Sequence, residues 1–157
     1  MVKRRAKKSK PARKAKPRAK ARARRPARHK PETLRLREVA VSLTVADLGR
    51  STAWYRDVLG FSEGERWEDN GRALGVQLKA GNVELMLSQD DQAKGRDRAK
   101  GAGVRLWATT AQDLDQLAAM ITSRGGSLAQ EPGDLAWGGR AFALTDPDGY
   151  AWTMIQA

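Results

Sequence analysis

The chain lacks cysteine altogether and has a single histidine, His29, among its 157 residues. Without cysteine it can form no disulfide bond and no thiolate site, which fits a reducing compartment. Long apolar runs are also missing, since none approaches the roughly 18 residues of a transmembrane helix. The basic N-terminus is not followed by the apolar stretch of a secretory signal. We therefore expect a cytoplasmic protein with no membrane partner.

Acidic residues are scarce in the first 32 positions, where 16 Lys and Arg side chains stand against one acid, Glu32. The formal net charge of +12 therefore comes from this segment, because residues 33–157 hold 14 basic and 17 acidic side chains. Dense like charge, four prolines and few apolar side chains predict a disordered tail over 1–32. Residues 33–157 have the size of one folded domain.

The tail has the composition of segments that bind polyanions through charge. Its cations can release counterions from phosphates, which gives affinity without sequence specificity, and it has no aromatic residue to stack on single-stranded bases. Nucleic acid is thus a candidate partner and nucleoid association a candidate location. The alternatives are an extension that only solubilises the protein, a mistranslated extension and, in a eukaryotic host, a targeting signal. We assign the nucleic-acid contacts to Lys3, Arg4, Arg5, Lys7, Lys8, Arg22, Arg24 and Arg25.

A near-repeat organises the rest of the chain. Segment 45–48, Val-Ala-Asp-Leu, returns 66 positions later as segment 111–114, Ala-Gln-Asp-Leu. The same shift aligns three further pairs: Ala53 with Ala119, Tyr55 with Ile121, and Gly60 with Gly126. A unit that cannot close a core alone is stabilised by pairing with a second copy, so we expect two modules, at about 36–88 and 104–156.

Local patterns predict β-α-β-β-β in each module, hence an α+β fold. Asp47 and Asp113 each suit a helix N-cap, and the first helix should run over about 48–59 with Ala53, Trp54 and Val58 buried and Tyr55 as a further candidate for the buried side. Alternation buries Val41, Leu43 and Val45 in the first strand. The expected strands are 38–45, 61–68, 73–79, 83–88, 104–109, 127–130, 140–145 and 150–155. A loop should span 89–103, another should span 132–139, and Asp146-Pro147-Asp148-Gly149 should form a turn.

These motifs together resemble the vicinal oxygen chelate superfamily, which contains glyoxalase I, bleomycin-resistance proteins and extradiol dioxygenases. The resemblance covers about residues 36–156, and its character is nearest to the metal-free bleomycin-resistance-like branch. It implies two βαβββ modules whose curved sheets enclose a cleft, and it does not choose among the superfamily's functions. The motifs that carry it are 45–48 with Ser51, 54–61 (Trp-Tyr-Arg-Asp-Val-Leu-Gly-Phe), 81–85 (Gly-Asn-Val-Glu-Leu) and 146–150 (Asp-Pro-Asp-Gly-Tyr).

The resemblance also locates where a metal would bind. In the metalloenzymes of this superfamily, His, Glu or Gln ligands face the cleft, and here the corresponding positions hold Ala40, Glu84, Arg105 or Leu106, and Thr153. Only Glu84 could be a ligand, whereas a catalytic zinc site generally needs about three protein ligands. We therefore predict no metal and no cofactor.

Strand alternation turns a mixed set of side chains toward the cleft. We expect a small aromatic or cationic ligand, with Trp107 stacking on it and Glu84 pairing with a cationic or donor group. The alternatives are that Glu84 is a solvated carboxylate paired with Arg105 and that the tryptophans only pack. The candidate ligand-binding residues are Ser42, Trp67, Glu84, Arg105, Trp107, Trp137 and Thr153.

The leading hypothesis is a metal-free protein that sequesters a small molecule, as antibiotic-resistance proteins do, and that forms a homodimer. Most of the family's metal-ligand positions hold residues that cannot bind a metal, which favours binding over catalysis but leaves open whether the protein is an enzyme. No catalytic residue is assigned. One alternative is a metal-dependent lyase, isomerase or dioxygenase that uses Glu84 as a base or ligand. Another is an interaction module that the tail brings to nucleic acid.

Overall fold

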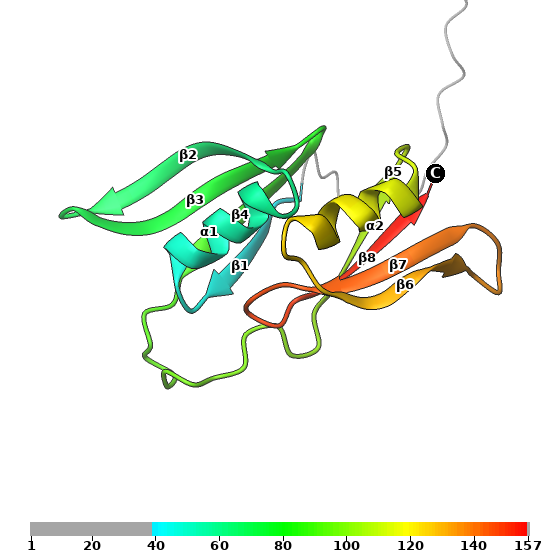
Figure 1. The fold of residues 1–157 in the computed structure, drawn as a ribbon. Coiled ribbons are helices and arrows are strands. Elements are labelled where there is room, and N and C mark those ends of the chain that lie inside the picture. The colour runs from blue at the N-terminus through cyan, green and yellow to red at the C-terminus, as the bar shows by residue number, and fades with distance from the viewer. Residues whose placement is uncertain (1–38, 157) are drawn as a thin grey trace, which may run out of the picture. The chain divides into compact units, whose positions relative to one another are not determined.

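The computed structural model describes residues 39–156, which form two mixed sheets with one helix packed on each (Figure 1). The first module comprises β1 (Val41–Val45), α1 (Leu48–Asp57), β2 (Ser62–Asp69), β3 (Arg72–Ala80) and β4 (Val83–Gln89). The second comprises β5 (Arg105–Thr110), α2 (Leu114–Ser123), β6 (Leu128–Asp134), β7 (Arg140–Thr145) and β8 (Ala151–Gln156). The predicted α+β fold of two βαβββ modules is confirmed. The predicted tail lies outside the described residues.

The two sheets repeat one topology. The first has the strand order β1-β4-β3-β2 and the second β5-β8-β7-β6. In each, the opening strand pairs in parallel with the last strand of its module, and the other pairings are antiparallel. The helix between the first two strands makes this parallel pairing possible, because parallel strands need a long crossover.

Both helices begin as the sequence predicts. The Asp47 carboxylate accepts a 2.9 Å hydrogen bond from the backbone N–H of Arg50, and Asp113 accepts one of the same length from Gln116. Each bond satisfies an amide that the first helical turn leaves without a partner. Neither α1 nor α2, the helices in the described part of the chain, has the length and apolar character needed to cross a membrane.

The core lies between each helix and the sheet face that it covers. Equivalent positions of the repeat are buried alike: Leu48 and Leu114 lie at the start of the two helices, and Tyr55 and Ile121 lie about two turns later. The sheets contribute alternate residues, as predicted for Leu43 and Val45. We call the opposite side of each sheet, which carries the intervening residues, its open face.

The buried side of α1 differs in part from the prediction. Val58 and Tyr55 are buried as predicted, and Leu48, Ser51 and Thr52 are buried as well, whereas Ala53 and Trp54 are only half-buried. Thr52 donates from Oγ1 to the carbonyl of Leu48 at 2.6 Å, and Ser51 also has a hydrogen-bond partner, so both hydroxyls can be buried at little cost. A pattern that counts only apolar residues therefore places this face wrongly.

Two strands also differ from the prediction. Val41 is 37% exposed rather than buried, because it lies at the end of β1. β6 extends to Asp134 and includes Pro132, although 132–139 was expected to be a loop. Pro132 is tolerated because β6 is an edge strand whose pairing with β7 shifts register twice between Leu128 and Gly133.

Side chains of the 146–150 turn join the second module to the first. Asp148 accepts hydrogen bonds from the backbone N–H of Ala46 at 2.7 Å and from the hydroxyl of Ser51 at 2.5 Å. Its charge thus lies at the N-terminal end of α1, where the helix dipole favours an anion. Tyr150 donates from its hydroxyl to the carbonyl of Thr44 at 2.9 Å. The motif that the sequence identifies as a turn is therefore also a contact between modules.

Candidate functional site

Three of the predicted site residues lie on the open face of the first sheet. Ser42 on β1 shares a 2.9 Å hydrogen bond with Ser88 on β4. Trp67 on β2 is 39% exposed, and its ring lies over Gly75, where a Cβ would approach the ring within 3.2 Å. Gly75 therefore leaves room for the indole to lie against the sheet. Glu84 on β4 is the third member of the group.

Glu84 has close partners on its own sheet. Gln77 on β3 donates to its Oε2 at 2.8 Å, and the ammonium of Lys79 lies 3.3 Å from its Oε1. The alternative of a pair with Arg105 is wrong, since Glu84 pairs with Lys79 instead. Both partners are on β3, next to Glu84 in the ladder, so they hold the carboxylate against the sheet.

Three more predicted residues lie on the open face of the second sheet. Arg105 and Trp107 are on β5, and Thr153 on β8 is the register partner of Trp107. β5 is hydrogen-bonded to β8 in the second sheet, and the Trp107 side chain is nevertheless 59% exposed. An indole this exposed on a regular strand is a flat apolar surface with a donor N–H, and it can stack on a planar molecule.

Trp137 is separate from both groups. It lies in the turn between β6 and β7, and its side chain is 74% exposed. Two backbone hydrogen bonds fix this turn, from Leu135 N–H to the Gly139 carbonyl at 2.8 Å and from Gly138 N–H to the Leu135 carbonyl at 3.0 Å. Gly138 and Gly139 both have positive φ, which a side chain would resist.

The predicted site residues thus form one group on each sheet, and Trp137 stands apart from both. Within 39–156, no hydrogen bond or ion pair connects the group on the first sheet with the group on the second. The predicted nucleic-acid contacts, from Lys3 to Arg25, lie outside the described residues.

The family positions for a metal do not bring a ligand set together. They hold Ala40, Glu84, Arg105 or Leu106, and Thr153, and the one carboxylate among them is already engaged by Gln77 and Lys79. In the part of the chain that the structure describes, no three His, Cys, Asp or Glu side chains are grouped so that they could hold a metal ion. These residues do not fit a metal centre of the family type.

Sequence patterns missed a buried network between the modules. The Tyr55 hydroxyl donates to Asp146 at 2.6 Å and accepts from the indole N–H of Trp152 at 3.2 Å. Asp146 also accepts from the backbone N–H groups of Asp148 and Tyr150. Burial raises the pKa of Asp146 and, together with the nearby carboxylate, the pKa of Tyr55. The Asp-Pro-Asp-Gly motif was the available signal, but it indicates only a turn.

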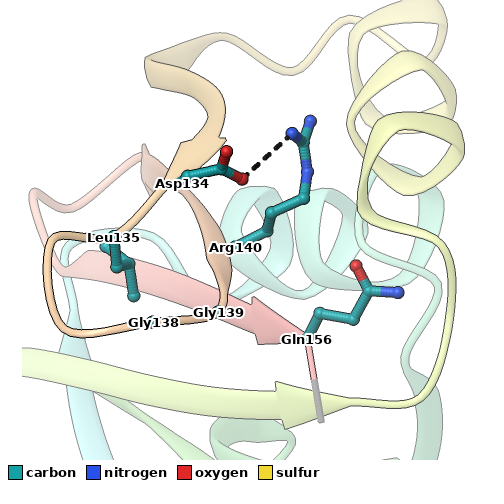
Figure 2. Close-up of a pocket in the computed structure, with 6 residues that line it drawn as sticks. All are labelled: Asp134, Leu135, Gly138, Gly139, Arg140 and Gln156. Carbon is teal, nitrogen blue, oxygen red and sulfur yellow. Dashed lines mark hydrogen bonds and ion pairs between the residues drawn. The ribbon is translucent and has the colours of Figure 1, made fainter.

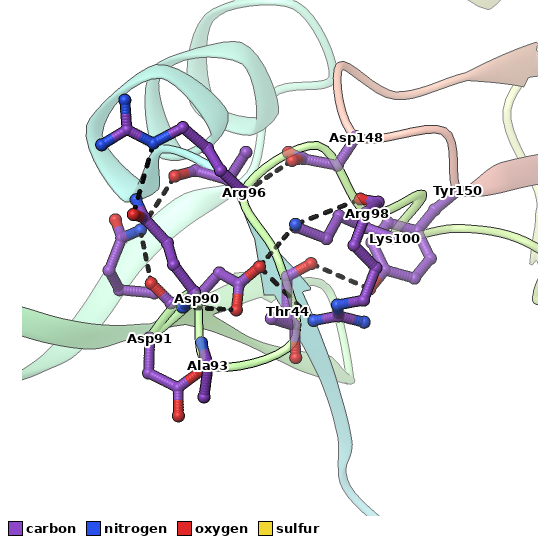
Figure 3. Close-up of polar contacts among 12 residues, drawn as sticks. Thr44, Asp90, Asp91, Ala93, Arg96, Arg98, Lys100, Asp148 and Tyr150 are labelled. Carbon is purple, nitrogen blue, oxygen red and sulfur yellow. Dashed lines mark hydrogen bonds and ion pairs between the residues drawn. The ribbon is translucent and has the colours of Figure 1, made fainter.

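A second missed cluster fixes the segment that links the modules (Figure 3). Asp90, directly after β4, pairs with the ammonium of Lys100, and both side chains are only 4% exposed. Arg98 lies 3.4 Å from the same carboxylate. The Lys100 ammonium, with the backbone N–H of Gln92, lowers the pKa of Asp90. Further along the linker, Gly101 donates its N–H to the carbonyl of Asp148, so this segment contacts both modules.

Comparison with known proteins identifies the relatives of this architecture. The family model described as "Glyoxalase/Bleomycin resistance protein/Dioxygenase superfamily" matches residues 37–154. A protein named lactoylglutathione lyase GLX1, from Arabidopsis thaliana, is 27% identical over 132 residues, which cover 80% of this chain and 46% of that protein. The chain spans about half the length of the curated relatives it matches.

Solved structures share the fold at low identity. TioX from Micromonospora sp. ML1 superposes with a TM-score of 0.62 at 23% identity, covering 74% of this chain and 95% of that one. A glyoxalase/bleomycin resistance protein/dioxygenase from Nocardioides gives a TM-score of 0.64 at 18% identity, covering 80% and 85%. Likeness at this level concerns the fold alone.

Proposed function

Because the chain belongs to the glyoxalase, bleomycin-resistance and dioxygenase superfamily, we propose that it is a metal-free protein that binds and sequesters a small planar molecule, aromatic or cationic, at the open faces of its sheets. The observation that carries the proposal is the exposed indole of Trp107 on β5. Covering such a ring with a ligand removes apolar area from water and allows stacking. Thr153 supplies a hydroxyl beside it, since the two residues are register partners.

The charged residues of the two open faces support a ligand with both apolar and polar parts. On the first sheet the Glu84 carboxylate is 43% exposed, so it can also pair with a ligand cation. On the second sheet Arg105 lies two positions from Trp107 on the same strand, where a guanidinium can hydrogen bond to an acceptor group. Sequestration needs only such contacts and no reacting group.

Fluorescence titration of the full-length protein with a set of planar aromatic cations, proflavine among them, tests this proposal. We expect saturable quenching that Trp107→Ala weakens by roughly tenfold, the effect of about 1.4 kcal/mol of lost stacking and apolar contact. Leu74→Ala is the matched control, because Leu74 is an exposed apolar residue of β3, 46% exposed, on the other side of the first sheet. Equal loss in both variants, or no saturable quenching, would contradict the proposal.

A metal-dependent lyase is the second candidate, because the curated relatives carry the name lactoylglutathione lyase. The residues at the family ligand positions do not fit this candidate, so we derive no catalytic step from them. Metal analysis of the purified protein and an assay of S-lactoylglutathione turnover test it. Stoichiometric metal together with turnover that Glu84→Gln abolishes would replace the binding proposal by this one.

We also propose that two copies of the chain associate as a homodimer through their open faces. Trp107 and Trp67 on these faces are 59% and 39% exposed, and a partner surface would remove these side chains from water. Light scattering coupled to size-exclusion chromatography should give twice the mass of one chain. Trp107→Glu, which puts a charge into the apolar face, should then give a single chain; a monomeric parent protein would contradict this.

For the tail we propose binding to duplex nucleic acid through charge. The 16 Lys and Arg side chains in 1–32 can neutralise many phosphates, so affinity for a duplex should fall steeply with salt. Deleting 1–32 should abolish both the binding and its salt dependence. Binding that survives the deletion would place the contact in the folded part, whose formal charge is negative, and would overturn the proposal.

A further inference from the structure

The free edge of β5 differs from the other outer edges of the two sheets. Strands β1, β2, β5 and β6 each lie at the edge of a sheet, with a paired strand on one side only. Such an edge exposes a row of backbone N–H and C=O groups, and another chain can pair with it unless charges, proline, bulges or a covering segment prevent this. An edge with none of these features is open to a partner.

Two of the edges are protected by their sequence and by irregular pairing. β2 has four acidic residues among its eight, and its pairing with β3 shifts register twice. β6 contains Pro132 and shifts register twice against β7, and its last residue, Asp134, pairs with Arg140 at 3.3 Å (Figure 2). Like charges repel a second strand of the same kind, and bulges and proline interrupt the row of hydrogen-bonding groups.

The edge of β1 is covered by side chains from the second module. The carbonyl of Val45 accepts a 2.9 Å hydrogen bond from the residue that follows β4, so the backbone groups of Val45 face β4, and those of its neighbours Thr44 and Ala46 face outward. The hydroxyl of Tyr150 donates to the outward carbonyl of Thr44. The carboxylate of Asp148 accepts from the outward N–H of Ala46. The second half of this short edge is therefore covered within the chain.

β5 has none of these protections. It pairs with β8 residue by residue without a register shift, contains no proline, and carries one charge, at its first position. Because the second sheet repeats the topology of the first, the residues of β5 on the helix-covered side face β8, and the backbone groups of Arg105, Trp107 and Thr109 point outward. Within 39–156, these outward groups have no hydrogen-bond partner. The edge of β5 is thus the unprotected edge among the described strands.

We propose that β5 pairs in antiparallel fashion with β5 of a second copy of the chain, about a two-fold axis. Pairing of this kind closes on itself and stops at two chains. All three outward residues can pair only if Trp107 lies opposite the partner's Trp107, because Arg105 then lies opposite the partner's Thr109. This register sets no like charges against each other and brings two aromatic residues together, and both features stabilise antiparallel pairs.

This pairing rests on the homodimer proposed above and adds the strand that forms it. The second sheets of the two copies become one continuous sheet, and the two Trp107 side chains lie next to each other on its open face. The surface proposed for a planar ligand then contains one indole from each copy.

Sedimentation equilibrium of the full-length protein tests the pairing through position 109. Thr109→Lys puts a cation opposite the partner's Arg105 at two places in each dimer, so the dissociation constant of the dimer should rise by roughly fivefold. Thr109→Glu puts an anion there and should lower this constant by a similar factor. Ser123→Lys and Ser123→Glu are the matched controls, because they make the same charge changes at the exposed end of α2. Equal shifts at the two positions would reflect net charge alone and would overturn the proposal.

Amide hydrogen exchange, followed by NMR, distinguishes edge pairing from a contact between open faces. The N–H groups of Trp107 and Thr109 should exchange slowly in the dimer and faster when the protein is diluted. Those of Leu106 and Ala108, which face β8, should stay protected at every concentration. A dimer in which the amides of Trp107 and Thr109 exchange freely would overturn the edge pairing and leave the homodimer standing, whereas a monomeric parent protein would overturn both.

Discussion

The hydroxyl of Tyr55 lies 2.6 Å from Asp146 Oδ2, which joins α1 to a turn 91 positions further along the chain. The same hydroxyl accepts the indole N–H of Trp152, and the rings of Tyr55, Phe61 and Trp152 meet edge to face. The hydrogen-bonded hydroxyl, carboxylate and indole N–H are thus enclosed in the largest aromatic cluster of the described core. Its hydrogen bonds are all satisfied within the protein, which makes it sensitive to the loss of any one member.

Replacing Tyr55 by Phe should destabilise the fold. The change removes the donor to Asp146 and the acceptor for Trp152, and it leaves both buried groups short of a partner. We expect the free energy of unfolding to fall by about 1–3 kcal/mol in urea titration. Tyr150→Phe is the control, because that hydroxyl is only part-buried and bonds to a backbone carbonyl; a cost equal to that of Tyr55→Phe would contradict the role given to the buried pair.

Asp146 should make stability decrease as pH rises. Burial raises its pKa in the folded protein, so the folded state favours the protonated form. This contribution is fully present below the unfolded pKa of about 3.9 and is lost as pH rises through the folded pKa. The free energy of unfolding of the parent protein, relative to Asp146→Asn, should therefore fall over this window.

Asp90 should act in the opposite direction. The Lys100 ammonium lowers its pKa in the folded protein, so its stabilising contribution is present above the unfolded pKa of about 3.9 and is lost as pH falls through the folded pKa. Asp90→Asn should lower the midpoint of urea unfolding at neutral pH and flatten the acid limb of the stability curve. Loss of the carboxylate leaves the buried Lys100 without its partner.

A double-mutant cycle separates the ion pair from other roles of Asp90. Lys100→Met removes the buried charge that Asp90→Asn leaves unpaired, so the double variant should be more stable than Asp90→Asn alone. If the two effects simply add, the ammonium and the carboxylate do not depend on each other, and the linker is held by its backbone contacts instead.

Gly101→Ala should disturb the docking of the linker on the 146–150 turn. A Cβ at position 101 would lie 2.1 Å from the backbone carbon and oxygen of Gly149, so one of the two segments must move. We expect a loss of about 1–3 kcal/mol, typical of overpacking, in urea titration. Gly133→Ala, where the nearest atom lies 3.9 Å away, should change stability by less than about 0.5 kcal/mol. Similar values for the two variants would contradict the close approach.

The fold was predictable wherever a signal is local. Asp47 and Asp113 cap their helices because an N-cap depends on residues within one turn. The Asp146–Gly149 turn formed as expected, with Gly149 at a φ of 89°. The prediction of a loop from Pro132 was wrong because the effect of a proline depends on whether its strand is central or at a sheet edge. The sequence does not show which of the two applies.

The candidate site was predictable only in part, for the same reason. Alternation placed Trp107 and Glu84 on open faces, but it could not show that Glu84 pairs with Lys79 across a ladder. Nor could it join Tyr55 to Asp146 or Asp90 to Lys100, since these pairs depend on how the modules and the linker meet. Trp137 was chosen as an aromatic near the cleft, whereas it lies in the exposed turn between β6 and β7, apart from the groups on both sheets.

The contact between Asp148 and the first turn of α1 also imposes an order of events during synthesis. Ser51 leaves the ribosome 97 residues ahead of Asp148, so the hydrogen bond between the two side chains cannot form until Asp148 has been synthesised. At a synthesis rate of about 5–20 residues per second, the delay is roughly 5–20 s. Throughout that interval the first module exposes the start of its helix to water, and a chaperone or a neighbouring nascent chain has access to a surface that the finished protein closes.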